Sequence, residues 1–412
     1  MEGMPHDKGL YMPQYLPDHS SLVEGIDTLS FQDISYVIAN SFLSEDFKKS
    51  QIEDIISDSI SFDTPLVNLN DNINILELFH GPTLAFKDFG ARFMARTMEN
   101  VVLDSNKEIN ILVATSGDTG SAVANGFYDV EGINVIILYP SKKVSYIQEK
   151  QLTTLDKNIY ALEINGTFDD CQNLVKEAFS DNELKKVINL SSANSINIAR
   201  LIPQSFYYFN AYSKLACRKK IILSVPSGNF GNITAGLLAK KMGLPIYKFI
   251  ASTNANRTIP DFLKTKKFIP KKSIKTLSNA MDVGNPSNIK RIMDIYKTID
   301  ELKNDFTSYS FDDSLTMHCV KDTFDKYNYI LDPHSAVGLI GLNYFLDSKD
   351  DYETIFLGTA HPAKFSDIIE PIIKTKVNIP ENLRKVIDKD KKSTLLNNKY
   401  SDFSNYLISN FK

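Results

Sequence analysis

The sequence predicts an α/β fold with mainly parallel sheets and an additional helical region at the N-terminus. From residue 109 onward, short apolar runs alternate with amphipathic stretches, which is typical of parallel strands joined by helices. Before about residue 75, apolar residues recur instead at helical spacing. A chain of 412 residues is also long for a single core, so we expect two or three domains.

The expected elements follow in order along the chain. Two helical stretches, SLVEGIDTLSFQDISYVIANSFL and FKKSQIEDIISDSI, come first, and a third helix begins near Phe86. INILVATS, INVIILYP and NIYALEI are then short strands, followed in turn by the helical segments GDTGSAVANGFYDV, VSYIQEKQLTTL and FDDCQNLVKEAF. A helix around INIARLIPQSFYYFNAYSKL leads to the strands KIILSVP and PIYKFIAST, and DYETIFLG is the last strand. The charged tail after about residue 380 is expected to be a solvated helix or a packing arm.

Composition and charge exclude several classes of function. The formal net charge of −4 gives no overall positive field that would favour nucleic acid. No apolar run is long enough to span a bilayer, and the N-terminus lacks the pattern of a secretory signal. The three cysteines are far apart and the six histidines show no ligand spacing, so we expect no metal site. A cytoplasmic protein without a nucleic-acid or membrane partner is therefore expected.

Lys87 lies in an unusual place, on the apolar side of the third expected helix. At about 100° per residue, Ala91 and Met98 lie almost directly above it, whereas Asp88 and Arg92 fall on the opposite side. One explanation is that the stem of Lys87 follows apolar surface while its amine reaches water. The other is that the amine is buried, because desolvation lowers a lysine pKa and a neutral amine can form a Schiff base with an aldehyde.

Three loops at strand ends offer groups that could bind a ligand. TSGDTG, residues 115–120, presents hydroxyls and backbone N–H groups that suit a carboxylate, although it could be a plain helix cap. PSGNFGN, residues 226–232, lets several N–H groups converge as in a phosphate cradle, although a tight turn would look similar. In LGTAHPAKF, Thr359 and His361 follow a buried strand directly, where they are either site residues or ordinary loop residues.

Taken together, these features match the requirements of one cofactor. Pyridoxal phosphate needs a lysine for its aldehyde, a cradle for its phosphate and a hydrogen-bond partner for its ring nitrogen. The lysine, the glycine loop and the hydroxyl at a strand end supply that set, and ligands of parallel sheets bind where such loops meet. The sequence therefore predicts a site for pyridoxal phosphate.

The motifs that carry these residues resemble those of the threonine synthase family, in its long form. HGPTLAFKDFG, ATSGDTGSAV, SINIARL, VPSGNFGNITAGLLAKKMGLP, TLSNAMDVGNPSN and FLGTAHPAKF all look like motifs of that family and stand in its order. The likeness runs from near residue 8 to about residue 370. It implies a pyridoxal-phosphate enzyme of fold type II, similar to tryptophan synthase β, with two parallel-sheet domains and an N-terminal helical region. The expected domains are residues 1–78, 79–100 with 215–375, 101–214, and a tail 376–412.

The resemblance also implies roles for individual residues. It makes Lys87 the catalytic lysine that bonds to the cofactor, with Thr359 at the pyridine nitrogen. The other implied cofactor contacts are Asp118, Gly228, Asn229, Phe230, Gly231 and Asn232. The implied substrate contacts are Thr115, Ser116, Gly117, Thr119, Asn197, Arg200 and Arg92, and the two arginines are expected partners of the substrate phosphate.

The family's reaction gives the expected function and its rivals. The resemblance implies conversion of O-phospho-L-homoserine and water to L-threonine and phosphate, by a monomer. A phospho-lyase of the same family would instead release a keto acid, and a serine or threonine dehydratase is a more distant rival. A catalytically inactive relative that binds partners is a third possibility, disfavoured by the intact Lys87 and glycine loop.

Overall fold

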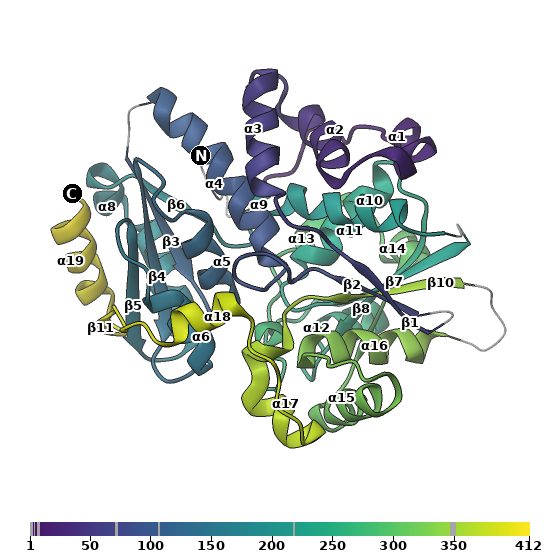
Figure 1. The fold of residues 1–412 in the computed structure, drawn as a ribbon. Helices are drawn as coiled ribbons and strands as arrows, with labels where there is room; N and C mark the ends of the chain where they lie inside the picture. Colours follow the sequence, from purple (N-terminus) through teal and green to yellow (C-terminus); the bar gives the residue numbers. More distant parts are fainter. Residues whose placement is uncertain are drawn as a thin grey trace.

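The computed structural model describes residues 3, 5, 9–70, 73–105, 108–216, 219–346 and 352–412. Within these ranges the chain forms a six-stranded sheet and a five-stranded sheet, which stand side by side (Figure 1). The N-terminal helices lie beside the larger sheet, and the C-terminus lies beside the smaller one (Figure 1). The prediction of an α/β fold with two mainly parallel sheets is confirmed.

The larger sheet has the strand order β1-β2-β10-β7-β8-β9. All neighbouring strands pair in parallel except β1 and β2, which are antiparallel. Both faces of its central strands are covered, which explains why these strands read as nearly continuous apolar runs. The bounds are β1 Leu66–Asn70, β2 Ile73–Glu77, β7 Lys220–Pro226, β8 Ile246–Thr253, β9 Phe306–Ser310 and β10 Tyr352–Gly358.

Helices cover both faces of the larger sheet. On one face lie α10 and α11, whose apolar side chains join the largest core cluster. On the other face α16 packs against β7, β8 and β10, and α15 packs on α16, so α16 is apolar nearly all round. The bounds here are η2 Ile202–Ser205, α10 Phe206–Ser213, α11 Gly231–Lys241, α12 Thr258–Thr265, η3 Asn279–Met281, α13 Ile289–Ile295, α14 Ile299–Asp305, α15 Asp313–Tyr327, α16 Pro333–Phe345, η4 Pro362–Phe365 and α17 Ser366–Ile373.

The smaller sheet has the strand order β11-β5-β4-β3-β6, and all its pairs are parallel. Helices α4, α5 and α6 share a core with one face, and α7, α8 and α19 share a core with the other. The strand bounds are β3 Ile109–Ala114, β4 Ile133–Pro140, β5 Ile159–Asn165, β6 Leu190–Ser192 and β11 Thr394–Asn397. The helix bounds are α4 Lys87–Ser105, α5 Asp118–Gly126, α6 Tyr146–Thr153, α7 Phe168–Ser180, α8 Asn182–Val187, α9 Ile198–Leu201 and α19 Tyr400–Phe411.

The N-terminal region is helical only as far as residue 59. Its elements are α1 Ser20–Glu24, η1 Ile26–Thr28, α2 Phe31–Leu43 and α3 Lys49–Ser59. A capping box between Ser30 and Asp33 starts α2. The expectation of a helical region up to about residue 75 is wrong for β1 and β2, which join the larger sheet. The proposed domain boundaries stay a prediction.

The C-terminal tail crosses from the larger sheet to the smaller one. After α17 it forms α18 (Glu381–Ile387), which packs against α6, and then β11, which extends the smaller sheet beside β5. Burial lowers the pKa of Lys391, but the carboxylate oxygens of Glu149 and Glu163, each 2.6 Å from its ammonium, outweigh burial and raise that pKa. The tail is thus a packing arm that also supplies an edge strand.

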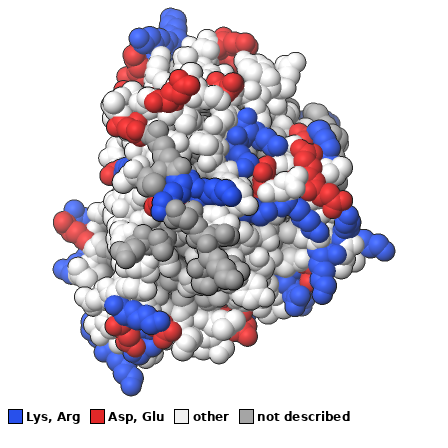
Figure 2. All heavy atoms as spheres, turned by 90° about the vertical axis from the view of Figure 1, so that its right-hand side faces the viewer, with Lys and Arg blue, Asp and Glu red and all other residues white. Residues whose placement is uncertain are grey.

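The surface in Figure 2 mixes both signs of charge, because Lys and Arg side chains lie among Asp and Glu side chains. Searched over the described ranges, the helices include none with both the length and the apolar character needed to cross a membrane. The same described part contains no group of three or more His, Cys, Asp or Glu side chains placed to hold a metal ion.

Candidate active site

Lys87 is the first residue of α4, and the end of β10 positions it. The segment before it pairs with the segment after β10: the Phe86 N–H donates to the Thr359 carbonyl at 3.0 Å, and Ala85 bridges Ala360. The Lys87 side chain is only 16% exposed, and its ammonium lies 4.7 Å from the centroid of the Phe86 ring. Burial is the main cause that lowers the pKa of Lys87. The amine therefore points into the protein, as the Schiff-base hypothesis requires.

Asp118, at the start of α5, faces two lysines. One carboxylate oxygen lies 3.9 Å from the Lys87 nitrogen, and the other lies 2.7 Å from the nitrogen of Lys364. Gln148 of α6 donates its side-chain N–H to the same oxygen that pairs with Lys364, at 2.9 Å. Although burial acts in the opposite direction, the two lysines hold the pKa of Asp118 well below its usual range. The site thus contains an ionised carboxylate beside the Lys87 amine.

Asp88 follows Lys87 in α4, and helical spacing places it on the opposite side of the helix from the apolar stripe. Its side chain is buried at 1% exposure and accepts hydrogen bonds from the Thr83 N–H and hydroxyl, at 2.9 and 2.5 Å. Burial raises the pKa of Asp88. The 83–88 turn that these bonds close fixes the chain immediately before Lys87.

The 115–120 loop is held by its own threonine. The Thr115 hydroxyl oxygen accepts the N–H groups of Gly117 and Gly120, both at 2.9 Å, so it shapes the loop from inside. Gly117 has φ 140°, and a Cβ there would lie 2.5 Å from the Gln148 side chain. Ser116 and Thr119 are half-buried at the N-terminus of α5. They remain the hydroxyls of this loop that could meet an anion.

The glycine loop between β7 and α11 is tightly curled. Phe230 adopts the left-handed conformation at φ 62°, and a Cβ on Gly228 would lie 2.7 Å from the Met281 Cα. Asn229 fixes the loop to its surroundings, because its side chain donates to the Ser195 hydroxyl and accepts from the Ser287 N–H, both at 2.6 Å. The Asn229 side chain is therefore engaged in holding the loop.

This loop fits a phosphate. It opens α11, a helix of eleven residues, so backbone N–H groups and the helix dipole both favour an anion there. The Asn232 side chain is 5% exposed, and its oxygen accepts the hydroxyls of Tyr207 and Tyr208 at 2.5 and 2.7 Å. Its amide nitrogen is buried without a hydrogen-bond partner in the described part of the chain. An orphaned donor beside such a helix start is what an absent anion would satisfy.

Gly231→Ala tests whether this loop holds the phosphate. A Cβ on Gly231 comes no closer than 3.5 Å to the Asn288 side chain, so the protein has room for the methyl group. We expect the free energy of unfolding without cofactor to change by less than about 1 kcal/mol. The affinity for pyridoxal phosphate should fall at least about tenfold, because the methyl group would crowd the bound anion.

Equilibrium dialysis measures that affinity, and thermal unfolding of the cofactor-free chain measures the stability. Gly25→Ala is the matched control, since a Cβ on Gly25 meets nothing within 4 Å. Unchanged affinity in Gly231→Ala would place the phosphate elsewhere.

Thr359 follows β10 and is 6% exposed. Its N–H donates to the Ser335 hydroxyl oxygen at 3.3 Å, and the Ser335 hydroxyl donates in turn to Asp332, the residue that caps α16. The other Asp332 oxygen lies 2.7 Å from the His334 ring. A buried hydrogen-bond network of Ser335, Asp332 and His334 therefore fixes the backbone of Thr359.

His361 is a structural residue of the same loop. Its Nδ1 accepts the Ala363 N–H at 3.1 Å and so caps η4, and its own N–H donates to the Leu84 carbonyl. Burial lowers the pKa of His361 to about 4, so the ring is neutral at physiological pH. Its role is to begin the short helix that carries Lys364.

Arg200 of α9 is a buried cation near Lys87. It is 2% exposed and donates to the Ala193 carbonyl, but its Nε has no hydrogen-bond partner among the described residues. Burial lowers the pKa of Arg200 to about 10, and the nearby Asp88 opposes that shift. Gly90 lets α4 pack directly against the backbone of Arg200, because a Cβ at position 90 would lie 2.6 Å from the Arg200 carbonyl oxygen.

The other two predicted substrate contacts hold parts of the protein's own structure, although the Arg92 Nε, like the Arg200 Nε, is buried without a hydrogen-bond partner among the described residues. The Asn197 side chain caps α9 and donates to the Ser192 carbonyl. The Arg92 guanidinium donates to the Asp58 carbonyl at 2.6 Å, in the N-terminal region. Their substrate roles stay predictions.

Sequence reasoning missed the residues that support the predicted ones. Lys364, Gln148 and Ser335 each contact a predicted site residue, and Asp332 contacts Ser335, yet none of the four was singled out. Lys364 stands inside the motif FLGTAHPAKF, so its place in that motif was an available signal. The other three gave no local signal, because their meaning depends on contacts between distant segments.

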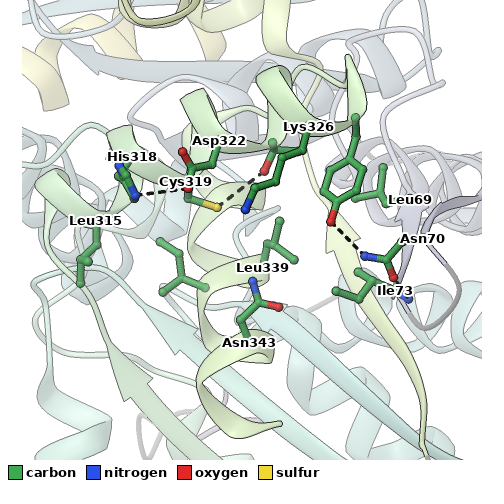
Figure 3. A pocket seen from close by; sticks show the side chains of 13 residues that line it. Leu69, Asn70, Ile73, Leu315, His318, Cys319, Asp322, Lys326, Leu339 and Asn343 are labelled. Atoms are coloured by element: carbon green, nitrogen blue, oxygen red, sulfur yellow. Dashed lines mark hydrogen bonds and ion pairs between the residues drawn. The ribbon is translucent and has the colours of Figure 1, made fainter. Parts of the chain in front are cut away.

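A separate hollow lies between α15, α16 and the β1–β2 pair (Figure 3). Its lining contains no residue of the glycine loop and neither lysine of the site. Cys319 lines it, but the thiol donates to the Ala336 carbonyl at 3.6 Å and burial raises the pKa of the thiol to about 12. This cysteine is therefore not an activated nucleophile.

Comparison with known proteins places this geometry in a family. The family described as "Pyridoxal-phosphate dependent enzyme" matches residues 60–357, and those described as "Threonine synthase N terminus" and "Threonine synthase, C-terminal" match residues 1–60 and 335–406. The threonine synthase of Buchnera aphidicola subsp. Acyrthosiphon pisum is 45% identical over 412 residues, with 98% of this chain and 95% of that protein covered. The chain belongs to the threonine synthase family.

Solved threonine synthases share the whole fold. The crystal structure of threonine synthase from Escherichia coli superposes with a TM-score of 0.93 at 40% identity, covering 99% of this chain and 95% of that chain. The pyridoxal-phosphate-bound threonine synthase from Brucella melitensis gives the same TM-score at 31% identity, covering 100% and 95%. This chain is thus a pyridoxal-phosphate-dependent lyase of fold type II, and the resemblance seen in its motifs is confirmed.

Proposed function

We propose that this threonine synthase converts O-phospho-L-homoserine and water to L-threonine and phosphate. The observation that carries the substrate assignment is Arg200, a buried guanidinium near Lys87 whose Nε has no hydrogen-bond partner among the described residues. A buried cation with an unused donor suits a second anion, and arginine binds phosphate well. The substrate phosphate is that anion.

The cofactor would be held at three points. The N–H groups of the glycine loop and the Asn232 amide would bind its phosphate, Lys87 would bond to its aldehyde, and the Thr359 hydroxyl would meet its ring nitrogen. Asp118 would lie near the ring hydroxyl. Bound pyridoxal phosphate supplies an electron sink for the bonds at the substrate Cα.

Lys87 is the group placed to move protons. When its amine is free and neutral it can take the proton from Cα, and burial favours that neutral form. The phosphate that leaves Cγ can carry off the proton lost from Cβ, while Lys87 passes its proton to Cγ. A water molecule then supplies the hydroxyl at Cβ, and Lys87 takes the remaining proton of that water and delivers it to Cα. Ser116 and Thr119 would orient the substrate carboxylate at the N-terminus of α5.

Product analysis tests this function directly. The protein loaded with cofactor is incubated with O-phospho-L-homoserine in water enriched in ¹⁸O, and the amino acid, keto acid and phosphate are quantified. We expect one threonine for each phosphate, with the label in the hydroxyl group. Phosphate accompanied by a keto acid and ammonia would identify a phospho-lyase instead. A monomeric, cytoplasmic enzyme is part of the same proposal, and gel filtration checks the oligomeric state.

A further inference from the structure

Two buried lysines share one carboxylate in this site, and they share it unequally. The Lys364 nitrogen lies 2.7 Å from one oxygen of Asp118 and also donates to the Thr83 carbonyl at 2.9 Å. The Lys87 nitrogen lies 3.9 Å from the other oxygen, near the outer limit of an ion pair. Asp118 is therefore engaged mainly with Lys364.

The surroundings of the two amines also favour an ammonium at Lys364 over an ammonium at Lys87. The Lys364 side chain is fully enclosed, and both of its contacts are oxygen acceptors. The Lys87 side chain keeps 16% exposure and lies over the Phe86 ring. Two ammonium groups beside one buried carboxylate would leave an uncompensated charge in a dry site, which is costly. One of the two lysines is better accommodated as a neutral amine.

We propose that Lys364 is a positioning residue that keeps the Asp118 carboxylate as its own ion-pair partner, so that the Lys87 amine is left free to lose its proton. The inference rests on the proposed role of Lys87 as the lysine that bonds to the cofactor. The proposal also explains why Lys364 is buried, because lysines are almost never fully buried unless they are paired. Gln148 supports the arrangement by donating to the oxygen that pairs with Lys364.

The other charged groups around Lys87 act in opposite directions. Arg200 and Lys364 disfavour an ammonium at Lys87, whereas Asp118 and Asp332 favour it. Asp88, one residue further along α4, lies near Arg200. Burial is the largest cause that lowers the pKa of Lys87. Lys364 lowers the pKa of Lys87 in two ways. Its positive charge repels a proton on Lys87, and it pairs with the Asp118 carboxylate that would otherwise stabilise an ammonium at Lys87.

The test is a double-mutant cycle on the full-length chain after removal of the cofactor. The pKa of Lys87 is obtained from the pH dependence of its labelling by acetic anhydride, read by mass spectrometry against exposed Lys374. Lys364→Met should raise the pKa of Lys87 by about one to three units, because Asp118 is released to Lys87. Asp118→Asn should not raise it, and Asp118→Asn with Lys364→Met should bring it back toward the original value.

Two further measurements keep the proposal falsifiable. Lys364→Arg keeps the charge and should leave the pKa of Lys87 within about one unit, even if Lys364→Met folds poorly. The rate at which pyridoxal phosphate bonds to Lys87 at pH 7 should fall at least about tenfold in Lys364→Met, in step with the fraction of neutral amine. An unchanged or lower pKa of Lys87 in Lys364→Met would overturn the proposal. Labelling needs no substrate, so a failure to make threonine would overturn the proposed function while leaving this cycle intact.

Discussion

Replacing Lys87 with alanine is expected to lower the rate of threonine formation by at least roughly 10²–10⁴-fold, because the variant loses the group that moves protons. The chain should still fold, because the Lys87 side chain contributes a long contact with Asp118, at 3.9 Å, and a contact with the Phe86 ring. The cofactor should still bind through the glycine loop, but borohydride should no longer fix it to the protein. Peptide mass spectrometry after borohydride treatment locates any remaining link.

Lys87→Arg is the matched variant, because it keeps a positive charge but cannot bond to an aldehyde. It should behave like Lys87→Ala in the borohydride experiment. Exposed Lys374 serves as the internal control for chance labelling. A cofactor that is still fixed to another lysine in Lys87→Ala would show that Lys87 had been assigned the wrong role, and Lys364 would be the first lysine to examine.

Thr359→Asp is expected to slow threonine formation by roughly 10²-fold or more, an effect typical of replacing one preorganised polar group in an active site. A hydroxyl can pair with the ring nitrogen without supplying charge, whereas a carboxylate would favour a protonated ring. The backbone of residue 359 should keep its place, because the Thr359 N–H donates to the Ser335 hydroxyl oxygen whatever the side chain. Steady-state kinetics and the visible spectrum of the loaded protein measure the two consequences.

Thr359→Ser keeps the hydroxyl and should retain most of the activity, so it separates the hydroxyl from the threonine methyl group. Cofactor affinity should be similar in all three proteins, because the phosphate is held elsewhere. Near-normal threonine formation by Thr359→Asp with an unchanged spectrum would remove Thr359 from the site. A loss of stability alone, without a change in rate, would mark it as an ordinary turn residue.

Much of the fold could be predicted because its strands are short, apolar and separated by helical segments. INVIILYP coincides with β4, and NIYALEI matches β5 to within one residue at each end, since both strands are covered on their two faces. The β1–β2 pair was missed because asparagines interrupt both strands and β1 is only half-buried, so neither strand shows a clear alternation. β11 was missed for a related reason: four mostly exposed residues form a strand only because β5 offers a free edge.

The site was predictable where a residue type is unusual in its local setting. A lysine on an apolar stripe and two glycines between a strand and a helix are such cases, and both lie where the expected cofactor would need them. Lys364 has no unusual local setting, and its importance arises only when η4 is placed beside α5. Charges contributed by separate segments require the tertiary structure, because the sequence gives their types but not their distances.

The C-terminal strand has a consequence for how this chain behaves in solution. With β11 in place, the backbone groups along one side of β5 are hydrogen-bonded within the same molecule. Without it, β5 would present a row of unpaired N–H and C=O groups beside apolar side chains, and such an edge recruits strands from other molecules. Ion pairs of Lys391 with Glu149 and Glu163, and of Lys392 with Asp156, help to keep the strand in position. The tail therefore replaces a largely apolar edge of seven residues with a mostly exposed edge of four, as well as joining the two sheets.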